Sequence, residues 1–320
     1  MRSSEHTCGC HRWGLILAGG DGTRLLPLTR SITGDERPKQ FCAVMGRETL
    51  LEQTQRRVSK LIPAWRTMLV LTAKHEPFYA AAVEGVPSAR LVIQPANRGT
   101  GAAILNSMLR VREMDHKAIV ACFPSDHHFS DEATFVRHIE CAYAAAAARP
   151  KTVVLLGIPP EAPEIEYGWI ERGVPIEGAL AKSVCRVSRF WEKPTAPIAS
   201  QLMANGCLWN SFVMVGQVQT FVELVKNALP SMSEAFEGAR RSLFTSAEEM
   251  AFNELYRRVR NSSFCQDVLA VQPDRLAVLQ ATGLGWSDLG EPGRVRSVLE
   301  GMTVRTERRL GVDQGLAAAH

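Results

Sequence analysis

The chain alternates short apolar runs with helical patterns through its first half, and this alternation limits the fold more than any other feature. The expected strands are 13–18, 67–73, 89–94, 117–124 and 152–158. The expected helices between them are 49–62, 100–114 and 132–148. In the second helix Ile104, Met108 and Val111 recur at the spacing of one buried face. Strands that are apolar throughout and separated by helices predict an α/β fold with a mostly parallel central sheet flanked by helices.

The rhythm changes after about residue 160. Extended segments at 167–172, 182–192 and 206–215 follow one another, and a helical stretch at 217–258 comes next. We interpret this half as an insertion that packs against the same sheet and recognises a second substrate. Because no linker or repeat divides the chain, we expect one domain over 13–302, with a loose tail at each end (1–12 and 303–320).

Composition excludes several classes of protein. The chain has 320 residues, a formal net charge of +4 and basic residues scattered among acids, which argues against a nucleic-acid-binding face. No apolar run approaches 18 residues, and the first residues lack a secretory signal pattern. Cysteines such as Cys122, Cys141 and Cys207 lie inside apolar runs, as reduced core residues do. A soluble cytoplasmic protein is therefore expected.

A glycine-rich segment, LAGGDGTRLLPLTR, follows the first expected strand. Gly19, Gly20 and Gly22 allow a tight turn and let a ligand approach the backbone closely. Ligands of open α/β sheets bind at the carboxyl ends of strands, where this turn should lie. Arg24 adds a guanidinium group suited to phosphate. The segment predicts an anion site, most simply for a nucleotide polyphosphate.

Two common phosphate-binding loops are excluded here. The G-x-x-x-x-G-K-[ST] pattern is absent, and the dinucleotide pattern G-x-G-x-x-G would need glycine in place of Leu25. A purely structural turn remains the alternative for the glycines. Downstream, Arg30, Arg37 and Lys39 add positive charge, although a solvated charge run is the alternative for these three residues.

The glycine segment begins a longer series of motifs. PKQF follows it, and then come QPANRGTGAAI (94–104), FPSDHH (123–128), EYGWIE (166–171), RFWEKP (189–194), LWNSFVM (208–214) and GWSDLG (285–290). In this order, the series resembles the sugar-phosphate nucleotidyltransferases over roughly residues 13–300. PKQF, FPSDH, WEKP and WNS are similar to the mannose-1-phosphate guanylyltransferase branch of that family.

The resemblance implies a Rossmann-like nucleotidyltransferase fold, in agreement with the strand–helix alternation. It implies Mg²⁺-dependent transfer of a nucleotidyl group from GTP to mannose 1-phosphate, which gives GDP-mannose and pyrophosphate. The attacking phosphate is already ionised at neutral pH, so positioning and charge stabilisation carry such catalysis. The first half (about 13–160) would bind the nucleotide and the second half (about 161–302) the sugar.

The resemblance also assigns residues to the reaction centre. Asp126 in FPSDHH and Asp288 in GWSDLG match metal-binding aspartates, and two carboxylates suffice because Mg²⁺ also takes phosphate oxygens and water. Arg24 and Lys39 match residues that contact the triphosphate and stabilise the transferring group. The expected catalytic residues are thus Arg24, Lys39 and Asp126. A helix N-cap or a turn is the structural alternative for Asp126.

Further positions match the family's substrate contacts. The nucleotide contacts implied are Gly19, Gly20, Gly22, Thr23, Gln94 and Gly99, the last two beside the base. The sugar-phosphate contacts implied are Gly168, Glu171, Lys193 and Asn210. A carboxylate and an amide suit sugar hydroxyls because the wrong epimer leaves them unpaired. For Asn210 an ordinary turn residue is the alternative.

The chain departs from the family pattern in three places. Relatives often carry aspartate where Cys265 stands in SSFCQDVLA, so either Asp267 replaces it or a contact is lost. Gln94 stands where guanylyltransferases often have glutamate, which leaves the base open. The segment between Arg30 and Pro38 is a few residues longer than usual, which allows the loop that carries Lys39 a different position.

Two other functions remain open at this point. One is the same reaction with another sugar 1-phosphate or nucleoside triphosphate. The other is a non-catalytic paralogue that senses nucleotide sugars, which Cys265 makes conceivable but the complete set of charged site residues argues against. The expected partners are GTP and mannose 1-phosphate, without nucleic acid or membrane. A homodimer is suggested by the resemblance alone.

Overall fold

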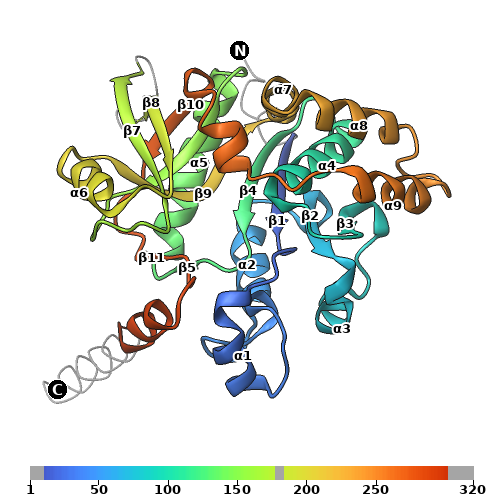
Figure 1. Cartoon of the computed structure of the whole chain (residues 1–320), viewed down its shortest axis with the longest axis horizontal. Coiled ribbons are helices and arrows are strands. Elements are labelled where there is room, and N and C mark those ends of the chain that lie inside the picture. Colours follow the sequence, from blue (N-terminus) through green and yellow to red (C-terminus); the bar gives the residue numbers. More distant parts are fainter. Residues whose placement is uncertain (1–10, 177–183, 302–320) are drawn as a thin grey trace, which may run out of the picture.

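A computed structural model describes residues 11–176 and 184–301, and most of its strands form one large sheet (Figure 1). The strands are Arg12–Leu17 (β1), Thr67–Thr72 (β2), Leu91–Gln94 (β3), Ile119–Pro124 (β4), His128–Phe129 (β5), Val153–Ile158 (β6), Gly168–Pro175 (β7), Val184–Glu192 (β8), Leu208–Gln217 (β9), Leu276–Gln280 (β10) and Trp286–Ser287 (β11).

Helices surround this sheet. They are Leu26–Thr33 (α1), Leu50–Ser59 (α2), Glu76–Tyr79 (α3), Gly99–Met114 (α4), Glu132–Ala148 (α5), Ala196–Ala204 (α6), Val218–Ala228 (α7), Pro230–Arg240 (α8) and Glu248–Arg258 (α9). A further helical segment covers 292–301. Shorter turns of helix used below are Thr23–Leu25 (η1), Lys39–Phe41 (η2) and Phe264–Leu269 (η7).

The large sheet is mixed, with the order β3-β2-β1-β4-β9-β6-β10-β8-β7. Strands β1 to β4 pair in parallel, as do β6 and β10. Strand β9 runs antiparallel between β4 and β6, and β8 runs antiparallel between β10 and β7. Among its described strands, only β8 and β9 oppose the common direction. The small strands β5 and β11 pair separately.

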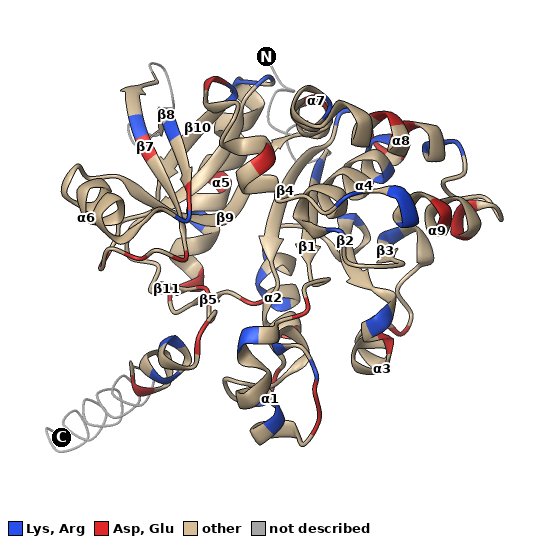
Figure 2. Cartoon of the chain, viewed as in Figure 1, with Lys and Arg blue, Asp and Glu red and all other residues tan. Residues whose placement is uncertain are grey.

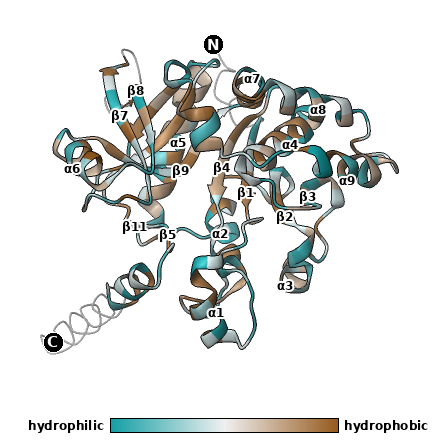
Figure 3. Cartoon of the chain, viewed as in Figure 1, coloured by the Kyte–Doolittle hydropathy of each residue, from teal (hydrophilic) through white to brown (hydrophobic). Residues whose placement is uncertain are grey.

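Helices cover both faces of the sheet, so the molecule has three layers. Side chains from α4, α7, α8 and α9 pack into one buried cluster, and those from α2, α3, α5 and α6 pack into the other. Along β1, Leu15 belongs to the first cluster and Ile16 to the second. This is why the strand is apolar at successive positions. Charged residues are scattered over helices and loops (Figure 2), while the central strands are hydrophobic (Figure 3).

The α/β class and the strand–helix alternation of the first half are confirmed. The predicted strands correspond to β1, β2, β3, β4 and β6, and the predicted helices to α2, α4 and α5. The helical stretch at 217–258 is divided into three helices. Pro230 begins α8 because it has no N–H to continue α7, and Phe244 has a left-handed φ of 61° in the turn before α9.

The second half contributes to the centre of the sheet as well as to its edge. Strand β9 lies between β4 and β6, and β10, which sequence analysis did not predict, lies beside β6. Consecutive strands β7 and β8 are antiparallel, as neighbours joined by a short connection are. Most strands of the large sheet therefore run in one direction, as predicted. About half of the pairings between neighbouring strands are nevertheless antiparallel, because β8 and β9 lie between strands of the common direction.

The N-terminal tail is shorter than predicted. Arg12 already belongs to β1, and the His11 ring nitrogen Nδ1 lies 2.8 Å from a carboxylate oxygen of Asp115. Residues 1–10 and 303–320, which complete the two predicted tails, lie outside the described residues. None of the helices in the described part of the chain is long and apolar enough to cross a membrane.

One edge of the sheet gathers the predicted motifs. Leu17 pairs with Pro124, so β1 and β4 end side by side. Thr72 pairs with Gln94, which ends β2 and β3 at the same edge. Strand β9 runs the other way and begins there, with Trp209 opposite Ile158. Loops from both halves of the chain therefore meet at the carboxyl ends of the parallel strands, where α/β proteins bind ligands.

Candidate active site

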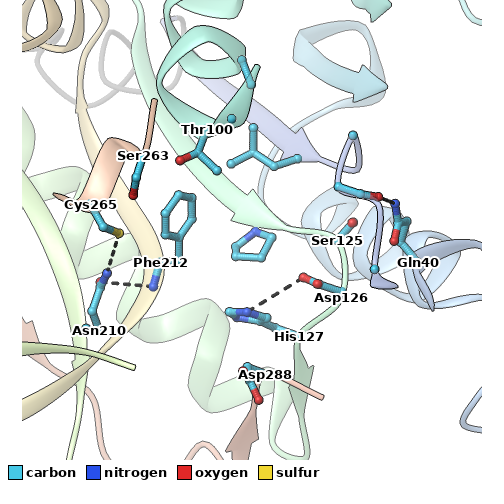
Figure 4. Close-up of a pocket in the computed structure, with 18 of the residues that line it drawn as sticks. Gln40, Thr100, Ser125, Asp126, His127, Asn210, Phe212, Ser263, Cys265 and Asp288 are labelled. Atoms are coloured by element: carbon cyan, nitrogen blue, oxygen red, sulfur yellow. Dashed lines mark hydrogen bonds and ion pairs between the residues drawn. The ribbon is translucent and has the colours of Figure 1, made fainter. Parts of the chain in front are cut away.

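A cavity of about 450 Å³, the main cavity, lies at this edge of the sheet (Figure 4). The predicted site residues that line it are Gly19, Gly20, Gly22, Arg24, Lys39, Gln94, Gly99, Asp126, Gly168, Lys193, Asn210 and Asp288. Thr23 lines a smaller adjoining pocket together with Gly22, Arg24, Lys39 and Asp126. Glu171 lines neither of them.

The glycine-rich loop is held by side chains beneath it. The Gln40 amide Nε2 donates to the carbonyls of Ala18 (3.0 Å) and Gly20 (2.7 Å), and the Thr72 hydroxyl donates to the Gly19 carbonyl (2.8 Å). Gly22 has a left-handed φ of 60°, and a Cβ there would lie 3.1 Å from the backbone nitrogen of Lys39. Glycine is needed at this position because the loop turns directly against the chain that carries Lys39.

Lys39 joins the two segments that carry the predicted metal ligands. Its ammonium Nζ lies 3.0 Å from Asp126 Oδ2, and it donates to the carbonyls of Asp288 (3.2 Å) and Leu289 (3.0 Å). The Lys39 side chain is only 11% exposed, so these contacts are sheltered from water. Asp126 follows β4 and Asp288 follows β11, 162 residues later, yet one cation contacts both segments.

Asp288 is surrounded by donors. Arg294 contacts both carboxylate oxygens, at 2.8 and 3.0 Å, and the Tyr167 hydroxyl and the Gly290 N–H each donate to Oδ1 at 3.0 Å. Burial acts to raise the pKa of Asp288, but its interactions with His127, with Arg294 and with the Gly290 N–H outweigh burial and lower the pKa. Asp288 is therefore a carboxylate at neutral pH.

His127 lies between the two aspartates. Trp286 Nε1 donates to His127 Nδ1 at 3.2 Å, so the ring proton belongs on Nε2, 3.9 Å from Asp126 Oδ1. Burial lowers the pKa of His127, and the attraction of Asp126 and Asp288 only partly opposes this. The neutral imidazole therefore lies beside Asp126 without adding a positive charge to the cavity.

The acidic residues fit a divalent cation. Asp126 and Asp288 offer hard oxygen ligands in one cavity. Within residues 11–176 and 184–301, no group of three or more His, Cys, Asp or Glu side chains could hold a metal ion unaided. An ion held here would take its remaining ligands from phosphate oxygens and water, and it would replace the present contacts with Lys39 and Arg294.

Two cations meet at the mouth of the main cavity. Arg24 Nη1 lies 2.8 Å from Glu166 Oε2, and Lys193 Nζ lies 4.0 Å from the same oxygen. Lys193 has a left-handed φ of 48°, and its backbone N–H donates to the Tyr167 carbonyl. Arg24 comes from the glycine-rich loop and Lys193 from the end of β8, so the mouth is bounded by both halves of the chain.

The far end of the main cavity is built on three strands. Gly168 pairs with Glu192, and a Cβ on Gly168 would lie 3.0 Å from Glu192 Oε2 and 3.3 Å from Asn210 Cβ. Glu192 Oε2 is buried and has no hydrogen-bond partner among the described residues. Asn210 donates from Nδ2 to Cys265 Sγ (3.5 Å) and accepts the Phe212 N–H at Oδ1 (3.1 Å) (Figure 4).

Glu171, a predicted sugar contact, lies outside the main cavity. Side chains alternate between the two faces of a strand, so Glu171, three positions after the cavity-lining Gly168, lies on the opposite face of β7. Its carboxylate instead accepts a hydrogen bond from Trp191 Nε1 at 3.4 Å. At this end of the main cavity the lining acid is Glu192, which sequence analysis missed although it directly precedes Lys193 in WEKP.

Asp267 does not take the position opened by Cys265. Its Oδ2 accepts the Ser263 N–H at 2.8 Å, which closes the first turn of η7, and Asp267 does not line the main cavity. Cys265 does line it. Burial, followed by the Glu192 charge, raises the pKa of the Cys265 thiol well above its usual value. The cavity therefore has a neutral thiol at this point.

The opposite end is formed by Gln94 and the start of α4. Gln94 is 2% exposed, and its Oε1 accepts the Tyr256 hydroxyl at 3.3 Å. Gly99 has a φ of 79°, and a Cβ there would overlap the Ser262 carbonyl oxygen. Asn97 and Thr100, which sequence analysis did not single out, also line this end.

The fold and this cavity define a class of protein: an α/β protein in which a glycine-rich loop, cations and acids surround one site for negatively charged ligands. The chain belongs to the nucleotidyl transferase family, whose model matches residues 13–303.

Comparison with individual proteins agrees with this membership. The chain is 31% identical over 294 residues to the xanthan biosynthesis protein XanB of Xanthomonas campestris pv. campestris, covering 89% of this chain and 59% of that protein. It is 31% identical over 286 residues to a mannose-1-phosphate guanylyltransferase of Sinorhizobium fredii, covering 86% of this chain and 52% of that protein. The chain thus spans between half and three fifths of these relatives.

A solved structure is similar over a larger share of its own length. It is a mannose-1-phosphate geranyltransferase from Thermus thermophilus, with a TM-score of 0.75 and 30% identity, covering 88% of this chain and 76% of that one.

Proposed function

We propose that the protein transfers a guanylyl group from GTP to mannose 1-phosphate and releases pyrophosphate. The observation that carries this proposal is the meeting of Arg24, Lys39, Asp126, Lys193 and Asp288 at one cavity. Two polyanionic substrates repel each other, so a catalyst for their reaction needs cations on both sides and acids that hold a metal ion between them. The names of two relatives, which contain mannose 1-phosphate, support the choice of sugar.

The nucleotide would lie along the glycine-rich loop, with its base between Gln94 and Gly99 and its phosphates toward Arg24 and Lys39. Gly19 and Gly22 are needed because side chains there would contact Gln94 and Lys39. The sugar would lie beyond Lys193, which would bind its phosphate. Asn210 and Glu192 would bind sugar hydroxyls, since the Glu192 Oε2 lacks a partner among the described residues.

Members of this family generally use a divalent metal ion, and Mg²⁺ is our proposal for this chain. Asp126 and Asp288 would hold it, and when bound it would neutralise charge on the transferring phosphate. Lys39 would then be released from Asp126 and become free to contact phosphate oxygens. His127 stays neutral and keeps the Asp126 carboxylate in position.

The proposal is tested with a panel of nucleoside triphosphates and sugar 1-phosphates, with released pyrophosphate as the readout. We expect the highest kcat/KM for GTP with mannose 1-phosphate and no turnover after the metal is removed by a chelator. Asp126→Asn should reduce kcat/KM by at least about a hundredfold. Asp115→Asn, at the opposite end of β4, is the matched control and should leave turnover unchanged.

Turnover with a different pair and none with GTP and mannose 1-phosphate would overturn the substrate assignment. Nucleotide-sugar binding without pyrophosphate release for any pair would favour a sensing protein. Full activity of Asp126→Asn would remove the assigned metal ligand.

A further inference from the structure

A second cavity, of about 370 Å³, is lined in part by α2, and we name it the α2 pocket. It is lined by Met45, Arg47, Glu48, Gln53, Arg56, Arg57, His128, Phe129 and Glu132. These residues come from the loop before α2, from α2 itself, from β5 and from the start of α5. None of them was assigned to the proposed reaction. The volume falls within the range of small-molecule sites, about 300–1,000 Å³.

Arg57 is the buried charge of the α2 pocket. Its side chain is 3% exposed and packs its guanidinium over the Phe129 ring, 4.9 Å from the centroid. Nη1 reaches the His127 carbonyl at 3.5 Å, Nε lies 3.6 Å from Glu132 Oε1, and Nε has no hydrogen-bond partner among the described residues. A guanidinium carries five N–H donors, so this one is short of acceptors. Burial lowers the pKa of Arg57 to about 10, and the Glu132 charge offsets this only in part.

The charges around Arg57 do not balance. Glu132 alone contacts three cations, with Oε2 3.0 Å from Arg56 and 2.5 Å from Lys60 and with Oε1 facing Arg57. Glu48 contacts Arg56 a second time, at 3.1 Å. Arg47, which is exposed, adds a further cation to the wall. Three arginines of the wall, Arg47, Arg56 and Arg57, therefore face two carboxylates, Glu48 and Glu132. Figure 2 shows basic residues on α2.

We propose that the α2 pocket binds a small phosphate-bearing anion. Phosphate oxygens would supply the acceptors that Arg57 lacks and negative charge for the three arginines of the wall. Met45 and the Phe129 ring offer apolar surface for a small organic body attached to the phosphate. An ordinary surface ion-pair network would account for Arg56 and Lys60, but it would not bury Arg57 with so few acceptors.

The position of the α2 pocket connects it to the main cavity. Arg57 contacts the carbonyl of His127, the residue after Asp126. Strand β5 forms part of the pocket wall and pairs with β11, with Phe129 opposite Trp286. Asp288 follows β11 directly. An anion in the pocket would therefore bind against β5, which follows Asp126 in the chain and pairs with the strand before Asp288. The proposed binding does not depend on the reaction assigned to the main cavity.

The test is calorimetric titration of the full chain with inorganic phosphate and, separately, with glucose 6-phosphate, at constant ionic strength in chloride. We compare the double variant Arg47→Met/Arg56→Met with a matched control, Arg24→Met/Lys193→Met, which removes two cations from the main cavity. We expect the first variant to weaken one class of phosphate site at least tenfold and the control to retain that site. Arg57→Met, the sharper variant, is added if it folds.

The two ligands separate the sources of the anion. Equal affinity for both would assign the pocket to the phosphate group itself, and a tenfold preference for glucose 6-phosphate would assign it to a phosphorylated organic molecule. The proposal is overturned if all phosphate binding disappears in the Arg24→Met/Lys193→Met control. It is equally overturned if Arg47→Met/Arg56→Met binds phosphate within twofold of wild type. Neither result bears on pyrophosphate release, which tests the proposed reaction.

Discussion

Two partly buried carboxyl groups of the main cavity, Glu192 and Asp288, have opposite surroundings. Asp288 is held by Arg294, Tyr167 and the Gly290 N–H, and its pKa is lowered. Burial raises the pKa of Glu192, and the opposing effects of Lys193 and the Cys265 thiol cancel only part of this rise. The protein thus satisfies Asp288 with its own donors and leaves Glu192 for a ligand.

This contrast predicts the pH dependence of stability. The folded pKa of Glu192 lies above its unfolded value, so its contribution is fully present below the unfolded pKa and is lost as pH rises through the folded pKa. We expect Glu192→Gln to be more stable than wild type by about 1 kcal/mol at pH 7.5 and equal to it below pH 4. Urea unfolding at both pH values measures this.

Asp288→Asn is the control of opposite sign. The folded pKa of Asp288 is lowered, so its stabilising contribution is present above the unfolded pKa and lost as pH falls through the folded one. This variant should be less stable than wild type at pH 7.5, with a difference that shrinks on acidification. If Glu192→Gln proved the less stable protein at pH 7.5, the Glu192 carboxylate would have a partner that the structure does not show.

Gly168 predicts a change in sugar binding. Its absent side chain leaves room between Phe190, Glu192 and Asn210, where a Cβ would lie 2.9 to 3.3 Å from their atoms. Gly168→Ala should displace Glu192 and lower kcat/KM for mannose 1-phosphate by roughly ten- to a hundredfold. The Kd for GTP, measured by calorimetry, should stay within twofold.

Gly238→Ala is the matched control for this substitution, because nothing lies within 4 Å of the added Cβ. This control should leave both the kcat/KM for mannose 1-phosphate and the Kd for GTP unchanged. If Gly168→Ala weakened GTP binding as much as it lowered kcat/KM for mannose 1-phosphate, Gly168 would have a general structural role and would not belong specifically to the sugar end of the main cavity.

At the scale of elements, the sequence pattern predicted those strands, helices and loops that depend on neighbouring residues in the chain. The strands and helices of the first half follow from apolar periodicity, and the glycine-rich loop follows from its residues. The position of β9 between β4 and β6 could not be predicted, because strand order depends on pairing between segments about 90 residues apart. Strand β10 was missed although LAVLQ is an apolar run.

The candidate site was predictable to the same extent. Motifs brought together most of the residues that line the main cavity, because each motif lies in a loop at one edge of the sheet. The position of Glu171 outside the main cavity could not be predicted, because a motif gives the order of residues and not the face of the strand on which each lies. The α2 pocket could not be predicted, since its residues come from α2, β5 and α5, which meet only in the folded protein.

The start of α4 gives a prediction at this scale. Gly99 combines a φ of 79° with a close approach to the Ser262 carbonyl oxygen, which an added Cβ would overlap. Gly99→Ala should therefore separate α4 from the chain before η7 and reduce the free energy of unfolding by at least about 2 kcal/mol. Chemical denaturation measures this loss.

Gly283→Ala separates the two causes. Gly283 has nearly the same φ, 73°, but nothing lies within 4 Å of an added Cβ. Its loss should be about 1 kcal/mol, from the backbone alone. If both variants lost the same stability, the contact between Gly99 and Ser262 would contribute nothing.

At the scale of the whole molecule, the sheet brings distant parts of the chain to one cation. Lys39 comes from the first eighth of the sequence and contacts segments that begin after β4 and after β11. A small core also packs the segment around Lys39 against the segment after Asp288. Its members include Leu25, Cys42, Leu50, Leu289 and Val295. The arrangement of the proposed metal ligands therefore depends on the complete domain and not on one half of it.

This dependence predicts that Asp126 and Asp288 act as a unit. If both hold one ion, removing either ligand already disrupts its binding, and removing the second adds little. We expect Asp126→Asn and Asp288→Asn each to lower kcat/KM by at least about a hundredfold. The double variant should fall no more than about tenfold below the less active single variant. Pyrophosphate release at saturating Mg²⁺ measures all three.

The control pairs Asp126→Asn with Asp115→Asn. Asp115 lies before β4 and binds His11 and Trp13, whereas Asp126 lies after β4. The strand of six residues between them spans about 20 Å, so these two substitutions should be additive. If the effects of Asp126→Asn and Asp288→Asn also multiplied fully, to about ten-thousandfold, the two carboxylates would act on separate steps. A single ion shared across the main cavity would then be the wrong account of why the sheet brings them together.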